Sequence, residues 1–162
     1  MSPESIYRVL LVCTGNTCRS PMAAAALDLA LASERERVEV RSAGTAAHDG
    51  QRAAESAIQI CRAAGSDLSE HRAMRVTPVL LARADLILVM EREHLSAVLG
   101  QGADPNKSHV LSEWPEPGEP ELAVSDPFGA SIEAYEECWR RIRRHLERVV
   151  PRVHEALRAR SA

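Results

Sequence analysis

Aromatic side chains are scarce in this sequence, which holds two Trp, two Tyr and one Phe among its 162 residues. Any core must therefore be built mainly from alanine, leucine and valine. No apolar run approaches the roughly 20 residues that a membrane-spanning helix requires, so we expect no membrane partner. The N-terminal segment MSPESIYRVLLVC is too short and too acidic for a secretory signal, and we expect a cytoplasmic protein.

An excess of positive charge is also missing, because the formal net charge is −3. A dedicated nucleic-acid binder is usually basic, so we expect no nucleic-acid partner. A chain of this length should form one domain, residues 1–162, and bury enough apolar surface to fold without a disulfide or a metal ion. We expect it to be a monomer or a weak dimer.

Cysteines with the spacing of a zinc site are absent. The four cysteines, Cys13, Cys18, Cys61 and Cys138, include no C-x-x-C pair and fit no zinc pattern with the histidines. In a reducing cytosol these thiols should be free. We therefore expect no metal site and no other cofactor. Five histidines should have ordinary surface or capping roles: His48, His94, His109, His145 and His154.

Short apolar runs alternate with helical patterns along the chain. Four runs are typical of strands: Val9–Cys13, Val38–Ser42, Ala84–Met90 and His109–Leu111. Helical patterns are found from about Arg19 to Leu31, over residues 51–64 and 91–99, and from residue 131 onward, where Pro151 should kink or split the helix. The alternation predicts an α/β fold with a parallel sheet. Residues 112–130, rich in proline, glycine and acids, should form a long functional or mobile loop.

The first strand ends at a thiol that opens a distinctive segment, Cys13–Arg19 (CTGNTCR), and Ser20 then enters a helix. In an open parallel sheet, ligands bind at the carboxyl ends of the strands. The backbone N–H groups of such a turn and the N-terminus of the helix attract an anion, and a guanidinium matches two phosphoryl oxygens. The spacing therefore predicts a phosphate-binding loop around Cys13 and Arg19.

The same surroundings should activate Cys13, since cationic neighbours and a helix N-terminus favour the thiolate. A thiolate beneath a bound phosphoryl group can attack in line and form a phosphocysteine, which water then hydrolyses. Asp126, in the long loop, is a candidate for the proton donor that this displacement needs. The alternative is an inert core cysteine, a surface Arg19, and an Asp126-Pro127 pair that serves only as a turn.

Several motifs, in matching order, resemble the low-molecular-weight protein tyrosine phosphatase family. Val12–Met22 (VCTGNTCRSPM) resembles its phosphate-binding loop, Arg41–Thr45 (RSAGT) its second-strand segment, and Leu68–Ala73 (LSEHRA) its middle loop. Ala84–Met90 and Asp126-Pro127 follow in family order. The resemblance covers nearly the whole chain. It implies a single-domain, three-layer fold in which a four-stranded parallel sheet carries helices on both faces.

The resemblance also implies a role for each matching residue. Cys13 would be the nucleophile, Arg19 would bind the phosphate and stabilise the transition state, and Asp126 would protonate the leaving group and then activate water. The loop would hold phosphate through Thr14, Gly15, Asn16, Thr17, Cys18 and Ser20. The residues that support its shape would be Asn16, Ser20, Ser42 and His71. Ser20 is also expected to hydrogen-bond the sulfur of the nucleophile.

The substrate is suggested by Thr17. The tyrosine-specific branch of the family typically has a larger aliphatic residue at this position, whereas the loop here resembles the bacterial arginine-phosphatase branch. A threonine leaves room for a polar guanidinium leaving group, and Phe128 is a candidate wall of the pocket. We therefore favour phosphoarginine in proteins as the substrate, with phosphotyrosine as the alternative. Neutral drift at position 17 would leave an ordinary tyrosine phosphatase.

Other functions stay open at this point. Cys18 lies in the same loop as Cys13, so the two could form a reversible redox pair, or Cys18 could merely pack under the loop. Arsenate reductases share this loop but need further cysteines, and residues 80–100 hold none. A phosphate-binding module without activity is a further alternative. The arginines of the last helix should form a solvated face rather than a binding surface.

Overall fold

Four parallel strands form the sheet that carries the site. The computed structural model describes residues 6–118 and 123–162, so residues 1–5 of the N-terminal segment and residues 119–122 of the long loop lie outside the description. The strands lie in the order β2-β1-β3-β4 across the sheet. Their bounds are Tyr7–Cys13 for β1, Val38–Gly44 for β2, Leu86–Val89 for β3 and Ser108–Val110 for β4. The predicted parallel sheet of four strands is confirmed.

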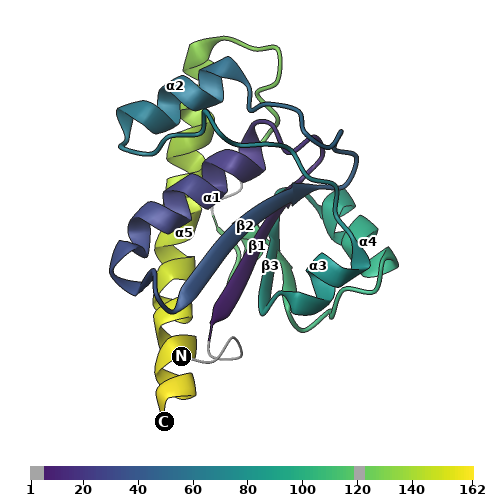
Figure 1. Cartoon of the computed structure of the whole chain (residues 1–162), viewed down its shortest axis with the longest axis vertical. Helices are drawn as coiled ribbons and strands as arrows, with labels where there is room; N and C mark the ends of the chain where they lie inside the picture. Colours follow the sequence, from purple (N-terminus) through teal and green to yellow (C-terminus); the bar gives the residue numbers. More distant parts are fainter. Residues whose placement is uncertain (1–5, 119–122) are drawn as a thin grey trace.

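Helices cover both faces of this sheet, as Figure 1 shows. Helices α1 (Arg19–Ala30), α2 (Glu55–Ala63) and α5 (Ile132–Ser161) lie on one side, and α3 (Pro78–Arg83) and α4 (Arg92–Gly100) lie on the other. Two single turns of 3₁₀ helix, η2 (Ala32–Glu34) and η3 (Leu111–Glu113), join elements. The predicted three-layer arrangement is therefore confirmed.

Alternate side chains of β1 reach opposite faces of the sheet. Val9, Leu11 and Cys13 belong to the core that also contains the apolar faces of α1 and α5, whereas Leu10 and Val12 belong to the core on the side of α3 and α4. Burial of each large aliphatic side chain contributes roughly 1.5–3 kcal/mol. Because both faces are covered, the central strands must be apolar at successive positions, which explains the continuous apolar runs in the sequence.

The strand order reverses at β1. The chain passes from β1 to β2 on one side, and β3 later pairs with the opposite side of β1. In open α/β sheets the crevice beyond the carboxyl ends of the strands, at such a switch point, is where ligands bind. Cys13 is the last residue of β1. The loop that follows it therefore opens into this crevice.

The second helix is shorter than the sequence pattern indicated. We expected a helix over residues 51–64, but α2 begins only after Ala54. The backbone N–H of Ala73 donates to the carbonyl of Gln51 at 2.7 Å, and the N–H of Ala54 donates to the carbonyl of Thr17 at 2.9 Å. These tertiary bonds hold the segment out of the helix and outweigh the helix propensity of its alanines.

Helix α5 continues without a break through Pro151, so the predicted split of this helix is wrong. Pro151 is exposed, whereas Val149 and Val153 on either side of it are fully buried. The proline removes one N–H donor on the solvent face of the helix. The packing of the apolar stripe on both sides holds the helix together in spite of this loss.

Helix α3 was not expected, although its start has a sequence signal. Thr77 is its N-cap, and the Thr77 hydroxyl accepts a hydrogen bond from the Leu80 N–H at 3.2 Å. Pro78 occupies the first turn, where a missing N–H costs nothing. A threonine followed by a proline therefore marked this helix, and its short length of six residues hid the apolar periodicity.

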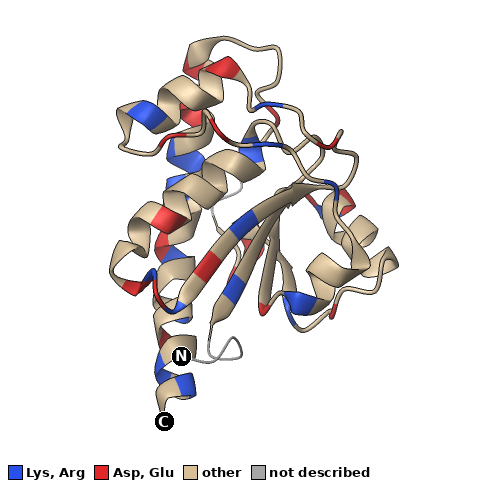
Figure 2. Cartoon of the chain, in the orientation of Figure 1, with Lys and Arg blue, Asp and Glu red and all other residues tan. Residues whose placement is uncertain are grey.

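The surface of α5 mixes both signs of charge, as Figure 2 shows along its length. Glu137 pairs with Arg140 and with Arg141, and Arg152 pairs with Glu155, all within one turn of the helix. Such exposed pairs are typical of a solvated face.

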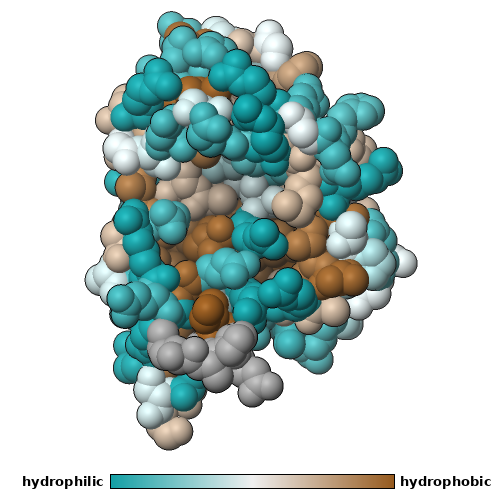
Figure 3. All heavy atoms as spheres, in the orientation of Figure 1, coloured by the Kyte–Doolittle hydropathy of each residue, from teal (hydrophilic) through white to brown (hydrophobic). Residues whose placement is uncertain are grey.

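On the side of the molecule drawn in Figure 3, hydrophobic residues gather in the centre and hydrophilic residues surround them. No described helix is long and apolar enough to cross a membrane.

A substitution at Gly44, the last residue of β2, tests how closely this strand packs against the loop after β1. A Cβ at Gly44 would lie 3.0 Å from the backbone N of Asn16 and clash with the carbonyl oxygen of Thr14. We predict that Gly44→Ala lowers the free energy of unfolding by about 1–3 kcal/mol. Gly100→Ala is the matched control, because nothing lies within 4 Å of that position. Urea denaturation checks both variants, and equal stability of the two would contradict the packing described.

Candidate active site

The loop after β1 brings a thiol to the N-terminus of α1. The helix begins at Arg19, with Cys18 as its N-cap, and no described side chain caps it there. The first N–H groups of the helix are therefore left for an anion, and the helix dipole adds positive potential at the same place. On the other side of the loop, the N–H of Thr45 donates to the carbonyl of Cys13 at 2.9 Å. The thiol and the positive end of the helix thus meet at the end of β1.

Asn16 provides the sharp bend of this loop. Its φ is +56°, in the left-handed region, whereas Gly15 does not have a positive φ. Asparagine tolerates this conformation better than most residues, but the conformation needs support. The Asn16 amide Nδ2 donates to Ser20 Oγ and to Ser42 Oγ, each at 2.9 Å. The side chain of Asn16 is fully buried, so these bonds replace water that it cannot reach.

Two further hydrogen bonds complete the anchoring of Asn16. Its Oδ1 accepts from the backbone N–H of Met74 at 2.9 Å. Its backbone carbonyl lies 2.8 Å from Nε2 of His71, which must therefore carry a proton to donate. The structure thus brings together the residues that the sequence assigned to loop support: Asn16, Ser20, Ser42 and His71.

Ser20 connects this support to the thiol. Its Oγ lies 2.9 Å from Cys13 Sγ. Because Asn16 donates to the same oxygen, the hydroxyl proton of Ser20 remains available for the sulfur. The carbonyl of Ala43, 3.4 Å away, is the weaker acceptor for that proton. A hydroxyl that donates to sulfur stabilises the charged thiolate, which is the nucleophilic form.

Arg19 is 2% exposed and faces two carboxylates. Its Nη1 lies 3.2 Å from Oε1 of Glu91, and its Nη2 lies 3.7 Å from Oδ2 of Asp126. Nη1 also donates to the carbonyl of Val124 at 3.2 Å. A buried guanidinium needs such partners. They fix its plane at the mouth of the loop and bring the long loop that carries Asp126 to the same place.

A pocket of about 280 Å³ opens above the thiol. It is lined by Cys13, Thr14, Gly15, Thr17, Cys18, Arg19, His48, Gln51, Asp126 and Phe128. Thr17 is 7% exposed and belongs to the inner wall, whereas Phe128 is 68% exposed and belongs to the rim. The structure therefore brings the sequence-predicted nucleophile, arginine, acid and substrate-facing residues to one cavity. His48, for which the sequence predicted only an ordinary surface or capping role, and Gln51, for which it predicted none, also line this pocket.

Cys18 has a partner that the sequence analysis missed. Its Sγ lies 3.3 Å from the hydroxyl of Tyr135 and 3.6 Å from Oγ1 of Thr17. Burial raises the pKa of the Cys18 thiol. Both Cys13 and Cys18 are free thiols, so the redox pair stays a prediction. Tyr135 is one of the buried residues of α5, and nothing in the helical pattern of the sequence reveals its contact with the loop.

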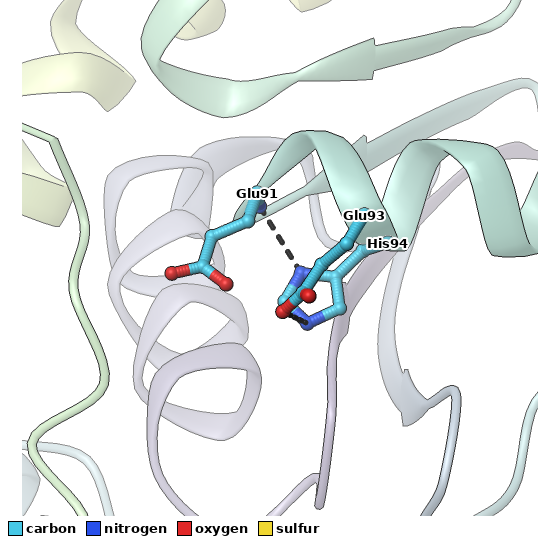
Figure 4. A group of neighbouring side chains, drawn as sticks. All are labelled: Glu91, Glu93 and His94. Atoms are coloured by element: carbon cyan, nitrogen blue, oxygen red, sulfur yellow. Dashed lines mark hydrogen bonds and ion pairs between the residues drawn. The ribbon is translucent and has the colours of Figure 1, made fainter.

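Glu91 and His94, at the start of α4, are the main residues of the site that the sequence analysis did not find. Figure 4 shows them with Glu93. His94 is 1% exposed, its Nδ1 accepts a hydrogen bond from the Glu91 N–H at 3.0 Å, and its Nε2 lies 2.8 Å from Thr14 Oγ1. Of the surface or capping role expected for His94, the capping part is correct and the surface part is wrong, because the ring is buried and its second contact reaches the loop.

Glu91, Glu93 and His94 offer ligand atoms within 4.8 Å of one another, the spacing of a metal site. Each of the two most buried members already has other partners. Glu91 pairs with the Arg19 guanidinium, and both ring nitrogens of His94 are used in hydrogen bonds. A cation would also have to approach the positive charge of Arg19. We therefore interpret the group as a hydrogen-bonded end of α4 and not as a metal centre.

Two histidines that hold the loop favour the neutral form. Burial lowers the pKa of His71. The hydrogen bond to the Asn16 carbonyl opposes this effect, and the neighbouring Arg72 adds a smaller lowering. Burial also lowers the pKa of His94, with a further lowering from Arg19 that Glu91 and Asp126 oppose. In the unfolded chain both should titrate near the ordinary value of about 6.5.

These lowered pKa values predict that acid weakens the fold. Below about pH 6.5 the unfolded chain binds protons that the folded histidines do not, so the free energy of unfolding falls as the pH is lowered through this range. His71→Gln keeps an N–H donor for the Asn16 carbonyl and cannot titrate, so the variant should show a weaker dependence on pH. Urea denaturation at about pH 5.5, 6.5 and 7.5, values that bracket the ordinary histidine pKa, measures the free energy of unfolding of both proteins. Parallel curves for both proteins would contradict the prediction.

Comparison with known proteins finds a matching family and several relatives. The model of the family "Low molecular weight phosphotyrosine protein phosphatase" matches residues 8–160. A probable low molecular weight protein-tyrosine-phosphatase, EpsP of Ralstonia nicotianae, is 39% identical over 149 residues, which cover 91% of this chain and 97% of that protein. A protein-arginine-phosphatase of Geobacillus stearothermophilus is 34% identical over 152 residues, which cover 93% of this chain and 96% of that protein.

A solved structure gives the same result for the fold. A mutant of the arginine phosphatase YwlE, which carries a phosphorylated active-site serine, aligns with a TM-score of 0.81 at 31% sequence identity. The alignment covers 91% of this chain and 95% of that one. The relatives are thus named after both phosphotyrosine and phosphoarginine, and they agree in the fold.

Proposed function

Since the chain belongs to the low molecular weight phosphotyrosine protein phosphatase family, we propose that it is a protein phosphatase that removes the phosphoryl group from phosphoarginine through a covalent intermediate on Cys13. Its general class, a cysteine-based protein phosphatase acting on phosphorylated proteins, follows from the family. The observation that carries the proposed mechanism is the meeting of Cys13, Arg19 and Asp126 in one pocket at the N-terminus of α1.

In the first step the thiolate of Cys13 attacks phosphorus in line with the leaving group. An S–P bond forms, the P–N bond of phosphoarginine breaks, and its electron pair goes to nitrogen, which takes a proton from Asp126. Arg19 turns its two η nitrogens from the carboxylates to the phosphoryl oxygens and stabilises their charge. The N–H groups at the start of α1 add to this stabilisation.

In the second step water replaces the sulfur. The Asp126 carboxylate takes a proton from the attacking water, the S–P bond breaks, and the products are inorganic phosphate and the Cys13 thiolate. Ser20, 2.9 Å from the sulfur, stabilises the departing thiolate by donating its hydroxyl proton. The phosphorylated active-site serine in the YwlE mutant supports such a covalent intermediate, because in that protein the active-site residue itself carries the phosphoryl group.

Thr17 supports phosphoarginine as the substrate. It belongs to the inner wall of the pocket, where a larger aliphatic side chain would fill the space beside the leaving group. A guanidinium is planar and polar. The protonated carboxyl group of Asp126, half-exposed at the mouth, can accept a hydrogen bond from it through the carbonyl oxygen and donate its own proton to the leaving nitrogen. Among the relatives, the Geobacillus stearothermophilus protein carries the name protein-arginine-phosphatase.

Phosphotyrosine is the second candidate, and Phe128 favours it. Its ring is largely exposed at the rim of the pocket, where it can stack on a phenyl ring that enters. The Ralstonia nicotianae relative is named a protein-tyrosine-phosphatase. Both candidates share the Cys13 mechanism and differ only in the leaving group.

As part of the proposal we place the protein in the cytoplasm as a monomer or a weak dimer. Its four cysteines are free and buried, which suits a reducing compartment.

The two substrates are separated by initial rates on phosphoarginine and phosphotyrosine peptides of the same sequence, with Cys13→Ser as the blank. We predict that kcat/KM for phosphoarginine is higher by at least about tenfold, which is 1.4 kcal/mol. Thr17→Ile should shift the ratio towards phosphotyrosine, because it fills the space for the guanidinium.

The control is Val79→Ala, which changes an exposed side chain outside the pocket and should leave the ratio unchanged. A higher kcat/KM for phosphotyrosine would contradict the arginine proposal and favour the second candidate. Rates no higher than those of Cys13→Ser on both peptides would contradict the proposed role of Cys13.

A further inference from the structure

His94 is a buried histidine that the mechanism above does not use, yet it touches the residue next to the nucleophile. Thr14 follows Cys13 in the loop and lines the pocket. Its Oγ1 lies 2.8 Å from His94 Nε2. His94 is held in turn by Glu91, the N-cap residue of α4, because its Nδ1 accepts the N–H of Glu91 at 3.0 Å. The ring therefore bridges α4 and the loop.

The contact with Glu91 decides where the proton of the ring lies. A backbone N–H can only donate, so Nδ1 must offer its lone pair and carry no proton. In a neutral imidazole the proton is then on Nε2, and Nε2 donates to Thr14 Oγ1. The opposite arrangement would set two N–H groups against each other at 3.0 Å.

The charges around His94 agree with a neutral ring. Arg19 on α1 disfavours a second positive charge, and burial does the same, whereas Glu91 on α4 and Asp126 in the long loop favour it. The exposed Glu93 carboxylate lies 3.9 Å from Nε2 and is too far for a hydrogen bond. Burial is the largest of these effects, and the pKa of His94 is lowered overall.

The Thr14 hydroxyl accepts a hydrogen bond from His94, so the proton of this hydroxyl points away from the imidazole ring. Thr14 is exposed to the pocket, and its backbone is fixed because its carbonyl accepts the N–H of Ala46 at 3.0 Å. A hydroxyl with a fixed acceptor side and a free proton beside Cys13 is a prearranged donor for an anion.

We propose that His94 is a positioning residue that orients the Thr14 hydroxyl, so that Thr14 donates a hydrogen bond to an oxygen of the phosphoryl group while it is transferred to Cys13. Thr14 thereby supplies one side-chain donor beyond Arg19 and the backbone N–H groups. The inference rests on the proposed reaction at Cys13. It does not depend on whether the leaving group is arginine or tyrosine.

Two substitutions at His94 separate its two hydrogen bonds. His94→Asn places an amide oxygen near the position of Nδ1, so it keeps the acceptor for Glu91 and loses the donor to Thr14. His94→Gln places an amide N–H near the position of Nε2, so it keeps the donor to Thr14 and loses the acceptor. Thr14→Val removes the hydroxyl and keeps the shape. His154→Asn, far along α5, is the matched control for loss of an imidazole.

Rates are measured on p-nitrophenyl phosphate, which gives the same phosphoryl transfer whatever the natural substrate. We expect His94→Asn and Thr14→Val each to lower kcat/KM by about tenfold, the effect of one hydrogen bond to a charged group. The double variant His94→Asn, Thr14→Val should have the same kcat/KM as Thr14→Val alone, because His94 acts only through the Thr14 hydroxyl. His94→Gln should recover most of the activity, and His154→Asn should match the wild type. Additive losses, or full activity of a folded His94→Asn, would overturn the proposal.

Alkylation of Cys13 by iodoacetamide tests whether the Thr14 hydroxyl donates its proton to the phosphoryl group or to the sulfur of Cys13. No phosphoryl group takes part in that reaction, so Thr14→Val should be alkylated at the wild-type rate. A change as large as the change in kcat/KM would show that the hydroxyl serves the sulfur instead, and it would overturn the proposal.

Two measurements do not require turnover. Nitrogen NMR of the wild-type protein at pH 7.5, above the ordinary histidine pKa of about 6.5, should show His94 protonated at Nε2 and not at Nδ1, and a proton on Nδ1 would overturn the proposal. Calorimetric titration with vanadate, which resembles the phosphoryl group in transfer, should show weaker binding to His94→Asn and not to His94→Gln. If the wild type turns over no faster than Cys13→Ser, the proposed function fails. Equal vanadate binding by all variants would refute the role of His94 independently of that result.

Discussion

The left-handed backbone of Asn16 is the constraint on which the site depends. A non-glycine residue in this region costs of order 1–3 kcal/mol and persists only where its surroundings enforce it. Here the enforcement comes from both sides of the bend. Ser20 and Ser42 bind the amide of Asn16, and Met74 and His71 bind its two oxygens. The bend turns the chain from β1 into α1 within a few residues, which sets the Cys13 thiol against the helix N-terminus.

Ion pairs with Arg19 hold distant parts of the chain beside this loop. Arg19 is buried at its end, and a buried guanidinium must be paired. Its partners are Glu91, the N-cap residue of α4, and Asp126, in the long loop before α5. Asp126, the proposed acid, is therefore brought to Cys13, the proposed nucleophile, by the same cation that would hold the phosphoryl oxygens. In the proposed mechanism an anion in the loop competes for Arg19 and leaves Asp126 free to meet the leaving group.

Local patterns in the sequence predicted the parts of the fold that local physics decides. Apolar runs without alternation indicated buried parallel strands, and the segment Cys13–Arg19 indicated an anion site at the end of the first one. What the sequence could not indicate depends on contacts between distant segments. The pairing of Gln51 with Ala73 shortened α2, and the buried stripe of α5 carried that helix through Pro151. His94 and Tyr135 reach the loop only because the fold brings α4 and α5 beside it.

The central claim is that the phosphoryl group passes through Cys13, and a trapped intermediate tests it most directly. Asp126→Ala should slow the hydrolysis of the phosphocysteine, since no base remains to activate water. This variant is mixed with p-nitrophenyl phosphate, quenched within the first turnover, and digested for mass spectrometry. The account predicts a phosphoryl group on the peptide that contains Cys13, and none on the same peptide from a Cys13→Ala, Asp126→Ala protein. A phosphoryl group on another residue, or release of p-nitrophenol with no labelled peptide, would contradict it.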